Sequence, residues 1–153
     1  MKLSESLKIN SNNIRIREFT MAGQALRVRV PLSSEMEAMN ERVKNAAWED
    51  QYKKMVDPLL EKKDSFDNEE IKFTDDDVFI NDKSIKELAK VAAQTNARIV
   101  EMFKLLVPVV DGADLSGLTY EDVESEFPFS VQLDISKKIA EVISPGYEET
   151  RKN

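Results

Sequence analysis

The side chains of this chain that could catalyse a reaction or bind a metal are carboxylates, because its 153 residues include no histidine and no cysteine. That absence removes the commonest general base near neutral pH, the commonest nitrogen ligand of metals and every thiol nucleophile. Two carboxylate groups stand out in the sequence, Asp75-Asp76-Asp77 and Asp111-Gly112-Ala113-Asp114. Their oxygen atoms are the kind of ligand that calcium and magnesium prefer.

Neither carboxylate group matches a calcium-binding EF-hand loop. The third and fifth positions from Asp111 are Ala113 and Leu115, and the fifth position from Asp75 is Phe79. Aspartates in turns usually accept hydrogen bonds from the nearby backbone, which is the favoured interpretation. The chain also has no P-loop, no G-x-S-x-G motif and no dinucleotide fingerprint. We therefore expect a non-enzyme without catalytic residues, metal or cofactor, and keep a carboxylate and divalent-metal enzyme as the third-ranked alternative.

An alternation of apolar and basic residues is the sharpest local pattern. Ile14-Arg15-Ile16-Arg17 and Leu26-Arg27-Val28-Arg29-Val30 flank Met21-Ala22-Gly23. This pattern predicts a β-hairpin with a three-residue loop, in which Gly23 takes the left-handed position.

The register of this hairpin follows from pairing apolar residues with apolar residues. Ile14 then lies opposite Val30, and Ile16 lies opposite Val28. This register gathers four guanidinium groups on one face: Arg15, Arg17, Arg27 and Arg29. We interpret the face first as a solvated surface and second as a docking patch for an acidic partner or a neighbouring subunit.

The remaining pattern predicts a mainly α fold, with α+β as the alternative. Apolar residues at helical spacing predict a helix over about 34–62, opened by a capping box at Ser34 and restarted at Pro58, and a second helix over about 84–107, opened at Ser84. A second small hairpin is expected around residues 75–77. A short helix is expected next, capped by Thr119-Tyr120-Glu121-Asp122, and a last helix follows Pro128. We expect the two long helices to form an antiparallel pair that packs with the C-terminal helices, with the first hairpin lying across them.

Length and composition indicate one domain over residues 1–153, with polar tails at about 1–13 and 145–153. No apolar run approaches the roughly 20 residues that a membrane-spanning helix needs, and the first residues have no apolar signal core. The net charge of −7 opposes nucleic-acid binding. We therefore expect a cytoplasmic protein that binds neither nucleic acid nor membrane.

Two further groups are candidates for binding a partner. Met36 and Met39, with Met55 and Trp48, could form an adaptable groove, although core packing is the commoner role of apolar residues at this spacing. Phe127 and Phe129 flank Pro128, so that one could belong to the core and the other could be an exposed anchor for a partner.

The order of these elements resembles that of the tail assembly chaperones of long-tailed bacteriophages. The resemblance rests on the basic hairpin with LRVRVPLSSEMEAM, the charged helices, and TYEDVESEFPFSVQLDISKKIAEVI followed by a polar tail. It implies an acidic, mostly helical protein without catalytic apparatus that coats the apolar tape measure protein and helps to recruit tail tube subunits.

Further expectations follow from the resemblance. The protein would form homo-oligomers, act in the cytoplasm of the bacterial host and be absent from the mature virion. The alternative is a structural tail completion or connector subunit, which would remain in the virion.

Overall fold

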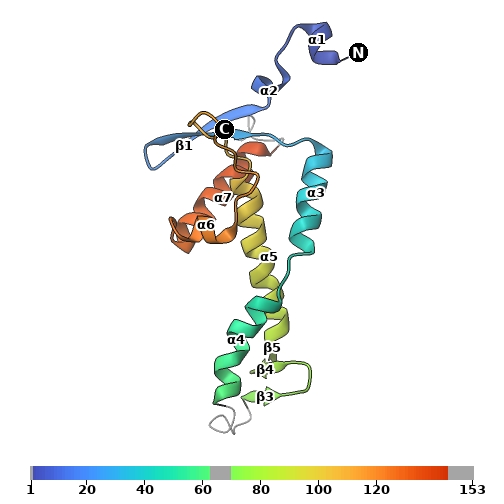
Figure 1. Cartoon of the computed structure of the whole chain (residues 1–153), viewed down its shortest axis with the longest axis vertical. Helices are drawn as coiled ribbons and strands as arrows, with labels where there is room; N and C mark the ends of the chain where they lie inside the picture. Colours follow the sequence, from blue (N-terminus) through green and yellow to red (C-terminus); the bar gives the residue numbers. More distant parts are fainter. Residues whose placement is uncertain (1, 63–69, 145–153) are drawn as a thin grey trace. The chain divides into compact units, whose positions relative to one another are not determined.

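The computed structural model describes residues 2–62 and 70–144 (Figure 1). These residues form helices and two small antiparallel sheets, an α+β mixture in which helix predominates. The chain divides into two compact units, here named the hairpin unit (Met1–Met39 and Ile99–Asn153) and the helix-pair unit (Asn40–Arg98). The single domain stays a prediction, and the polar tail predicted at 145–153 lies outside the described residues.

The hairpin unit begins with two short helices, α1 (Leu3–Leu7) and α2 (Ser11–Ile14). The Asn10 side chain caps α2, accepting hydrogen bonds from the backbone N–H groups of Asn12 and Asn13. Neither helix contains a buried residue. The segment predicted as a polar tail at 1–13 is therefore partly helical, and it lies on the surface of its unit.

The first hairpin forms as predicted, but its predicted register is wrong. Strands β1 (Ile16–Met21) and β2 (Gln24–Arg29) pair so that Arg17 lies opposite Val28 and Phe19 lies opposite Leu26. The loop has two residues, Ala22 and Gly23, both with positive φ, as in the tight turns that match strand twist.

The register is set by the apolar residues nearest the loop. Phe19 and Val28 are buried, with Met21 and Leu26 packed against them. Ile14, which the prediction placed in the strand, belongs to α2 and is 66% exposed. A one-residue change of register moves every side chain of a strand to the other face. The observed register is the one that puts Phe19, Met21, Leu26 and Val28 on the same, buried face of the hairpin.

The far edge of β2 is covered by residues 105–107. The Arg29 N–H donates to the Leu105 carbonyl and the Val107 N–H donates to the Arg27 carbonyl, each over 2.9 Å. Val28 and Leu106 form the bridge between these two segments. Among the described residues the sheet therefore keeps one uncovered edge, that of β1.

Helices α6 (Tyr120–Glu124) and α7 (Phe129–Ile143) complete the hairpin unit. Thr119 and Asp122 form the capping box that the sequence predicts at the start of α6. The buried core joins the hairpin to α7 and to the end of α5 (Ile85–Phe103) through these side chains: Phe19, Val28, Ile99, Phe103, Val123, Ile135, Ile139 and Val142.

The predicted helix over 34–62 is wrong as one element. Helix α3 (Ser33–Lys44) ends before residues 45–48, and α4 (Glu49–Glu61) follows. The predicted capping box at Ser34 is also wrong, because the helix begins at Ser33 and Glu35 accepts the Leu32 N–H over 3.1 Å. Pro58 lies inside α4 and does not start a new helix.

In the helix-pair unit, α4 runs antiparallel to the first turns of α5 (Figure 1). Val56 of α4 and Ile85 of α5 form a small core with Val78 of the second sheet. That sheet confirms the predicted second hairpin, with β3 (Ile71–Phe73) and β4 (Val78–Ile80) antiparallel, and adds a short strand β5 (Lys83–Ser84). Ser84 caps α5 as predicted, since its hydroxyl accepts the Glu87 N–H over 3.1 Å.

Candidate functional site

The four arginines of the hairpin do not share one face, which corrects the prediction. In the observed register Arg17 points to the inner face with Phe19, whereas Arg27 and Arg29 lie on the outer face. Arg15 precedes β1 and stands outside the strand. The predicted concentration of four guanidinium groups is therefore absent, and each arginine has its own surroundings.

Arg17 fastens β1 to the end of α7. Its Nη1 atom donates to the Val142 carbonyl oxygen over 2.5 Å and to the Ser144 carbonyl oxygen over 3.4 Å. The last carbonyl groups of a helix have no partner within the helix, and they lie at the negative end of its dipole. Arg17 is half-buried in this position, so that its contacts are structural.

Arg15 joins the start of β1 to the start of α3. Its Nε donates to the Val30 carbonyl over 3.0 Å, and its Nη2 pairs with the Glu35 carboxylate over 2.6 Å. The hydrogen bond from the Leu32 N–H is the main cause that lowers the pKa of Glu35. Burial opposes it, and the charge and hydrogen bond of Arg15, with the charge of Arg29, lower the pKa further.

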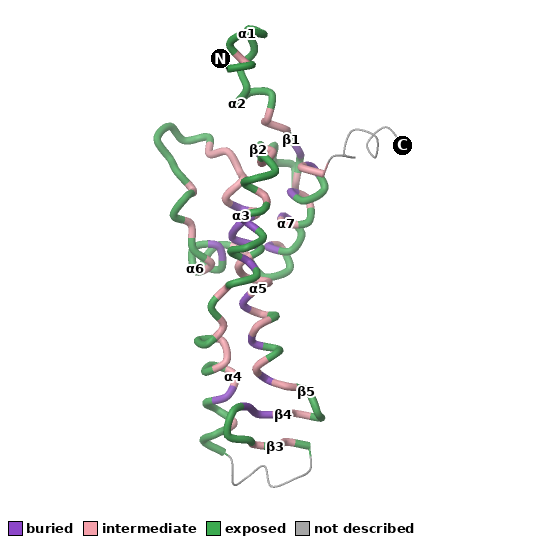
Figure 2. The backbone as a smooth tube through the Cα atoms, turned by 90° about the vertical axis from the view of Figure 1, so that its right-hand side faces the viewer, coloured by how far each residue is buried: buried purple, intermediate pink, exposed green. Residues whose placement is uncertain are grey.

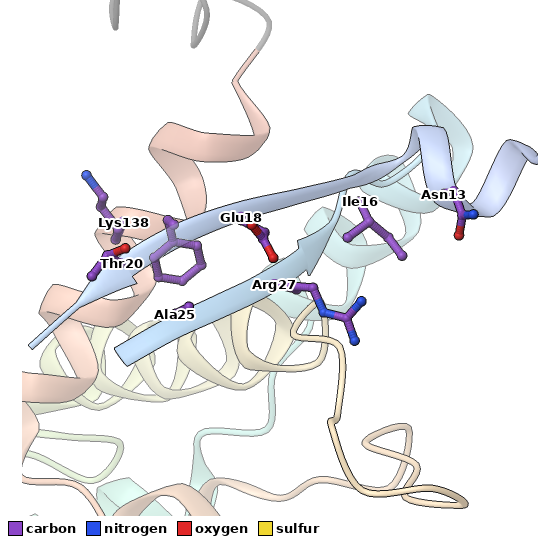
Figure 3. Close-up of a pocket in the computed structure, with 8 residues that line it drawn as sticks. Asn13, Ile16, Glu18, Thr20, Ala25, Arg27 and Lys138 are labelled. Carbon is purple, nitrogen blue, oxygen red and sulfur yellow. The ribbon is translucent and has the colours of Figure 1, made fainter. Parts of the chain in front are cut away.

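The outer face of the hairpin carries an open, polar hollow (Figure 3). Arg27 and Glu18 lie directly opposite each other on β2 and β1, and α7 contributes Lys138. The remaining lining residues are Asn13, Ile16, Phe19, Thr20 and Ala25. With an acidic and two basic side chains, the hollow does not have the single sign of charge that an acidic-partner patch requires.

The predicted methionine and phenylalanine contacts divide between core and surface. Met39 is buried and Met36 is half-buried, which matches the alternative of core packing. Phe127 packs against Phe103 with ring centroids 5.7 Å apart, whereas Phe129 remains 44% exposed. Of these four side chains, Phe129 is the one that is exposed.

Three helices each expose a pair of large apolar side chains at helical spacing. These pairs are Leu3 and Leu7 on α1, Leu88 and Val91 on α5, and Phe129 and Leu133 on α7. Figure 2 shows α1 exposed along nearly its whole length. Residues three or four apart share one face of a helix, so that each pair forms a small apolar contact surface.

Leu88 follows Ile85 by three residues, a helical spacing that predicts a place for it in the buried stripe of the helix. The structure buries Ile85, Ala89 and Ala93 instead and leaves Leu88 45% and Val91 60% exposed. Ile85, Ala89 and Ala93 are four residues apart and so lie on one side of the helix, which is the buried side. This spacing in the sequence would have shown that Leu88 lies beside the buried side and not on it.

In the helix-pair unit the most densely hydrogen-bonded acid is Asp77, which is buried. Its carboxylate accepts hydrogen bonds from the Ser84 hydroxyl, from the Val78 N–H over 2.7 Å and from the Lys86 N–H over 3.0 Å. Burial alone would raise the pKa of Asp77, but these hydrogen bonds, with a contribution from the Tyr52 hydroxyl, lower it. Asp77 thus joins β4 to the start of α5.

A second open hollow lies beside Trp48, where the chain passes between α3 and α4. The Nζ atoms of Lys86 and Lys90 lie 5.9 and 5.2 Å from the centre of the indole ring, within the range of cation–π attraction. Tyr52 meets the same ring edge to face, with centroids 5.9 Å apart. These contacts hold Trp48 against α5.

Asp114, in the second carboxylate group, has a local partner. Asp114 accepts hydrogen bonds from the N–H and the hydroxyl of Ser116, each over 2.9 Å, and this bonding lowers its pKa. This is the turn role that the sequence favours. Within residues 2–62 and 70–144, no three acidic side chains gather as they would around a metal ion, and no helix there has the length and apolarity to cross a membrane.

Comparison of the chain with protein-family models, with curated proteins and with solved structures found no match.

Proposed function

We propose that this chain is a non-catalytic chaperone that holds an apolar, helical client protein in solution. The proposal follows the resemblance to phage tail assembly chaperones. On that basis the client is the tape measure protein, and the protein also helps to recruit tail tube subunits. It acts in the cytoplasm of the bacterial host and leaves before the virion is mature.

The observation that supports this function is the exposed apolar pair on α5. Leu88 and Val91 are 45% and 60% exposed and lie on one face of a 19-residue helix. Half-buried Thr95 continues this face by one turn towards the end of the helix. Anchors at this spacing are what a helix presents when it lies against the apolar face of another helix. A weak contact of this kind, repeated along a rod by many copies, holds a long client through multivalency.

The acidic character of the chain supports the same proposal. Its net charge of −7 would add negative charge to a client covered by many copies. A high net charge keeps a protein complex soluble and separate from its neighbours.

The test is co-expression with the long reading frame downstream of this gene, followed by pull-down and by measurement of the soluble fraction of its product. We expect the product to become soluble and to co-purify. Leu88→Ser with Val91→Ser should weaken the pull-down about tenfold or more, because each buried apolar side chain contributes about 1.5–3 kcal/mol.

The matched control is Val109→Ser with Val110→Ser. These valines are 86% and 75% exposed and lie in a loop rather than on a helix. Equal loss of binding in both double variants would contradict the assignment to α5. An insoluble product with nothing bound would refute the chaperone, and detection of this chain in purified virions would favour a structural tail subunit.

A further inference from the structure

Among the residues that the structure describes, the first two helices of the hairpin unit bury none of their side chains. Helix α1 has five residues and α2 has four, and no residue of either is buried. Isolated helices shorter than about 12 residues are marginal in water, so that short helices usually need a surface to pack against. This arm (residues 2–14) carries four exposed apolar side chains: Leu3, Leu7, Ile9 and Ile14.

A surface of matching chemistry lies on α7. Phe129 and Leu133 are one turn apart and are 44% and 45% exposed. Leu3 and Leu7 have the same spacing on α1 and are 72% and 58% exposed. Each pair is an apolar strip of about one helical turn, the unit from which a helix–helix contact is built.

The charges around these two strips have opposite signs. The arm carries Lys2 and Lys8 against a single acidic residue, Glu5. The strip on α7 follows directly after an acidic segment whose carboxylates are all exposed: Glu121, Asp122, Glu124 and Glu126. Helix α6, which bears three of them, is fastened to α7 where the Tyr120 hydroxyl donates to Gln132 over 2.8 Å. Charge complementarity of this kind favours one orientation and one partner.

We propose that two copies of this chain exchange their arms, so that Leu3 and Leu7 of each copy pack on Phe129 and Leu133 of the other. Lys2 and Lys8 then face the acidic segment of the partner copy. The same contact occurs twice about a two-fold axis, which closes the assembly as a dimer. The inference goes beyond client binding, because it assigns the pairs on α1 and α7 to self-association and leaves the pair on α5 to the client.

The experiment is sedimentation equilibrium of the purified full chain, without any client. We expect a dimer. Leu3→Ser with Leu7→Ser should raise its dissociation constant about a hundredfold or more, because two apolar side chains lose their burial in each of two contacts. The control Val109→Ser with Val110→Ser should leave the dissociation constant unchanged. Since α1 contains no buried residue, the arm variant should also keep the circular dichroism spectrum of the wild type.

Charge reversal tests where the arm binds without removing any apolar side chain. Lys2→Glu with Lys8→Glu should weaken the dimer, and so should Glu124→Lys with Glu126→Lys. The protein with all four substitutions should recover it. A monomeric wild type at about 100 μM, or arm variants that dimerise as the wild type does, would overturn the proposal. Loss of the dimer in the arm variants with no recovery on charge exchange would also overturn it, because the arms would then bind elsewhere.

Discussion

Arg17 and Arg27 look alike in the sequence, but from the structure we expect the replacement of Arg17 to lower stability and the replacement of Arg27 to leave it nearly unchanged. Arg17 donates to the last carbonyl groups of α7, those of Val142 and Ser144. Arg27 lies on the exposed outer face of the hairpin. Arg17→Gln shortens the side chain and removes its charge, so that these carbonyl groups lose this donor. Arg27→Gln makes the same chemical change where no helix end depends on it.

The magnitude follows from the lost contact. A hydrogen bond from a charged group contributes about 1.5–3 kcal/mol to stability, and a cation at a helix C-terminus adds about 0.3–1 kcal/mol. Because Arg17 is half-buried rather than buried, we expect Arg17→Gln to cost about 1.5–3 kcal/mol, or roughly 3–12 °C in Tm for a chain of this length. Arg27→Gln should stay within about 0.5 kcal/mol.

The assay is urea unfolding followed by two signals. Far-ultraviolet circular dichroism reports the helices of both units, whereas the single tryptophan, Trp48, reports the helix-pair unit alone. If the units unfold separately, Arg17→Gln should shift the circular dichroism transition and leave the fluorescence transition in place. Equal effects of Arg17→Gln and Arg27→Gln would refute the reasoning, because the two arginines would then be energetically equivalent.

Three further predictions concern stability. Asp77→Asn should destabilise the helix-pair unit at pH 7, where the lowered pKa of Asp77 favours the folded state. The advantage of the wild type, followed by Trp48 fluorescence, should be full above about pH 4 and should shrink as the pH falls through the lower pKa of the folded state. Gln132→Leu should lower the free energy of unfolding in urea by about 1–3 kcal/mol for each polar partner that it leaves unpaired. Tyr120→Phe should lower the free energy of unfolding less in the Gln132→Leu variant than in the wild type, because the Tyr120 hydroxyl has already lost its acceptor there. Ala22→Asn should raise the free energy of unfolding by about 0.5–1 kcal/mol in thermal unfolding. The reason is that Ala22 has a φ of 52°, a conformation that asparagine tolerates better than alanine. No gain in stability would mean that the turn is not strained.

Local patterns predicted the elements whose determinants lie within a few residues. The capping box at Thr119 and the cap at Ser84 form as expected, because a helix start depends on contacts three residues apart. The second hairpin also forms where its strands were predicted. In each of these cases the residues that decide the structure are neighbours in the sequence.

The break between α3 and α4 depends instead on distant residues. Ala46 and Ala47 favour helix strongly, although Asn45 and the basic Arg42 and Lys44 are residues typical of a helix end. The chain leaves the helix there and turns Trp48 toward Lys86 and Lys90, some forty residues further on. Tertiary contacts override local propensity at this point, and a sequence pattern carries no record of them.

For the candidate surfaces, the sequence shows which residue types are present, but it does not show which of them face solvent. The sequence left open which of Phe127 and Phe129 is exposed, and whether the arginines form a solvated surface or a docking patch. The strand register and the rotation of each helix decide which of these side chains reach solvent. In the hairpin, the burial of Phe19 and Val28 separated the arginines. In α5, Ala89 lies on the buried side of the helix, and its neighbour Leu88 is therefore exposed. A buried alanine is expected where two packed elements approach closely, and single exposed apolar side chains are common on protein surfaces. Leu88 is therefore informative only together with Val91, because two exposed apolar side chains on one helix face form the contact surface on which the proposed binding of a helical client depends.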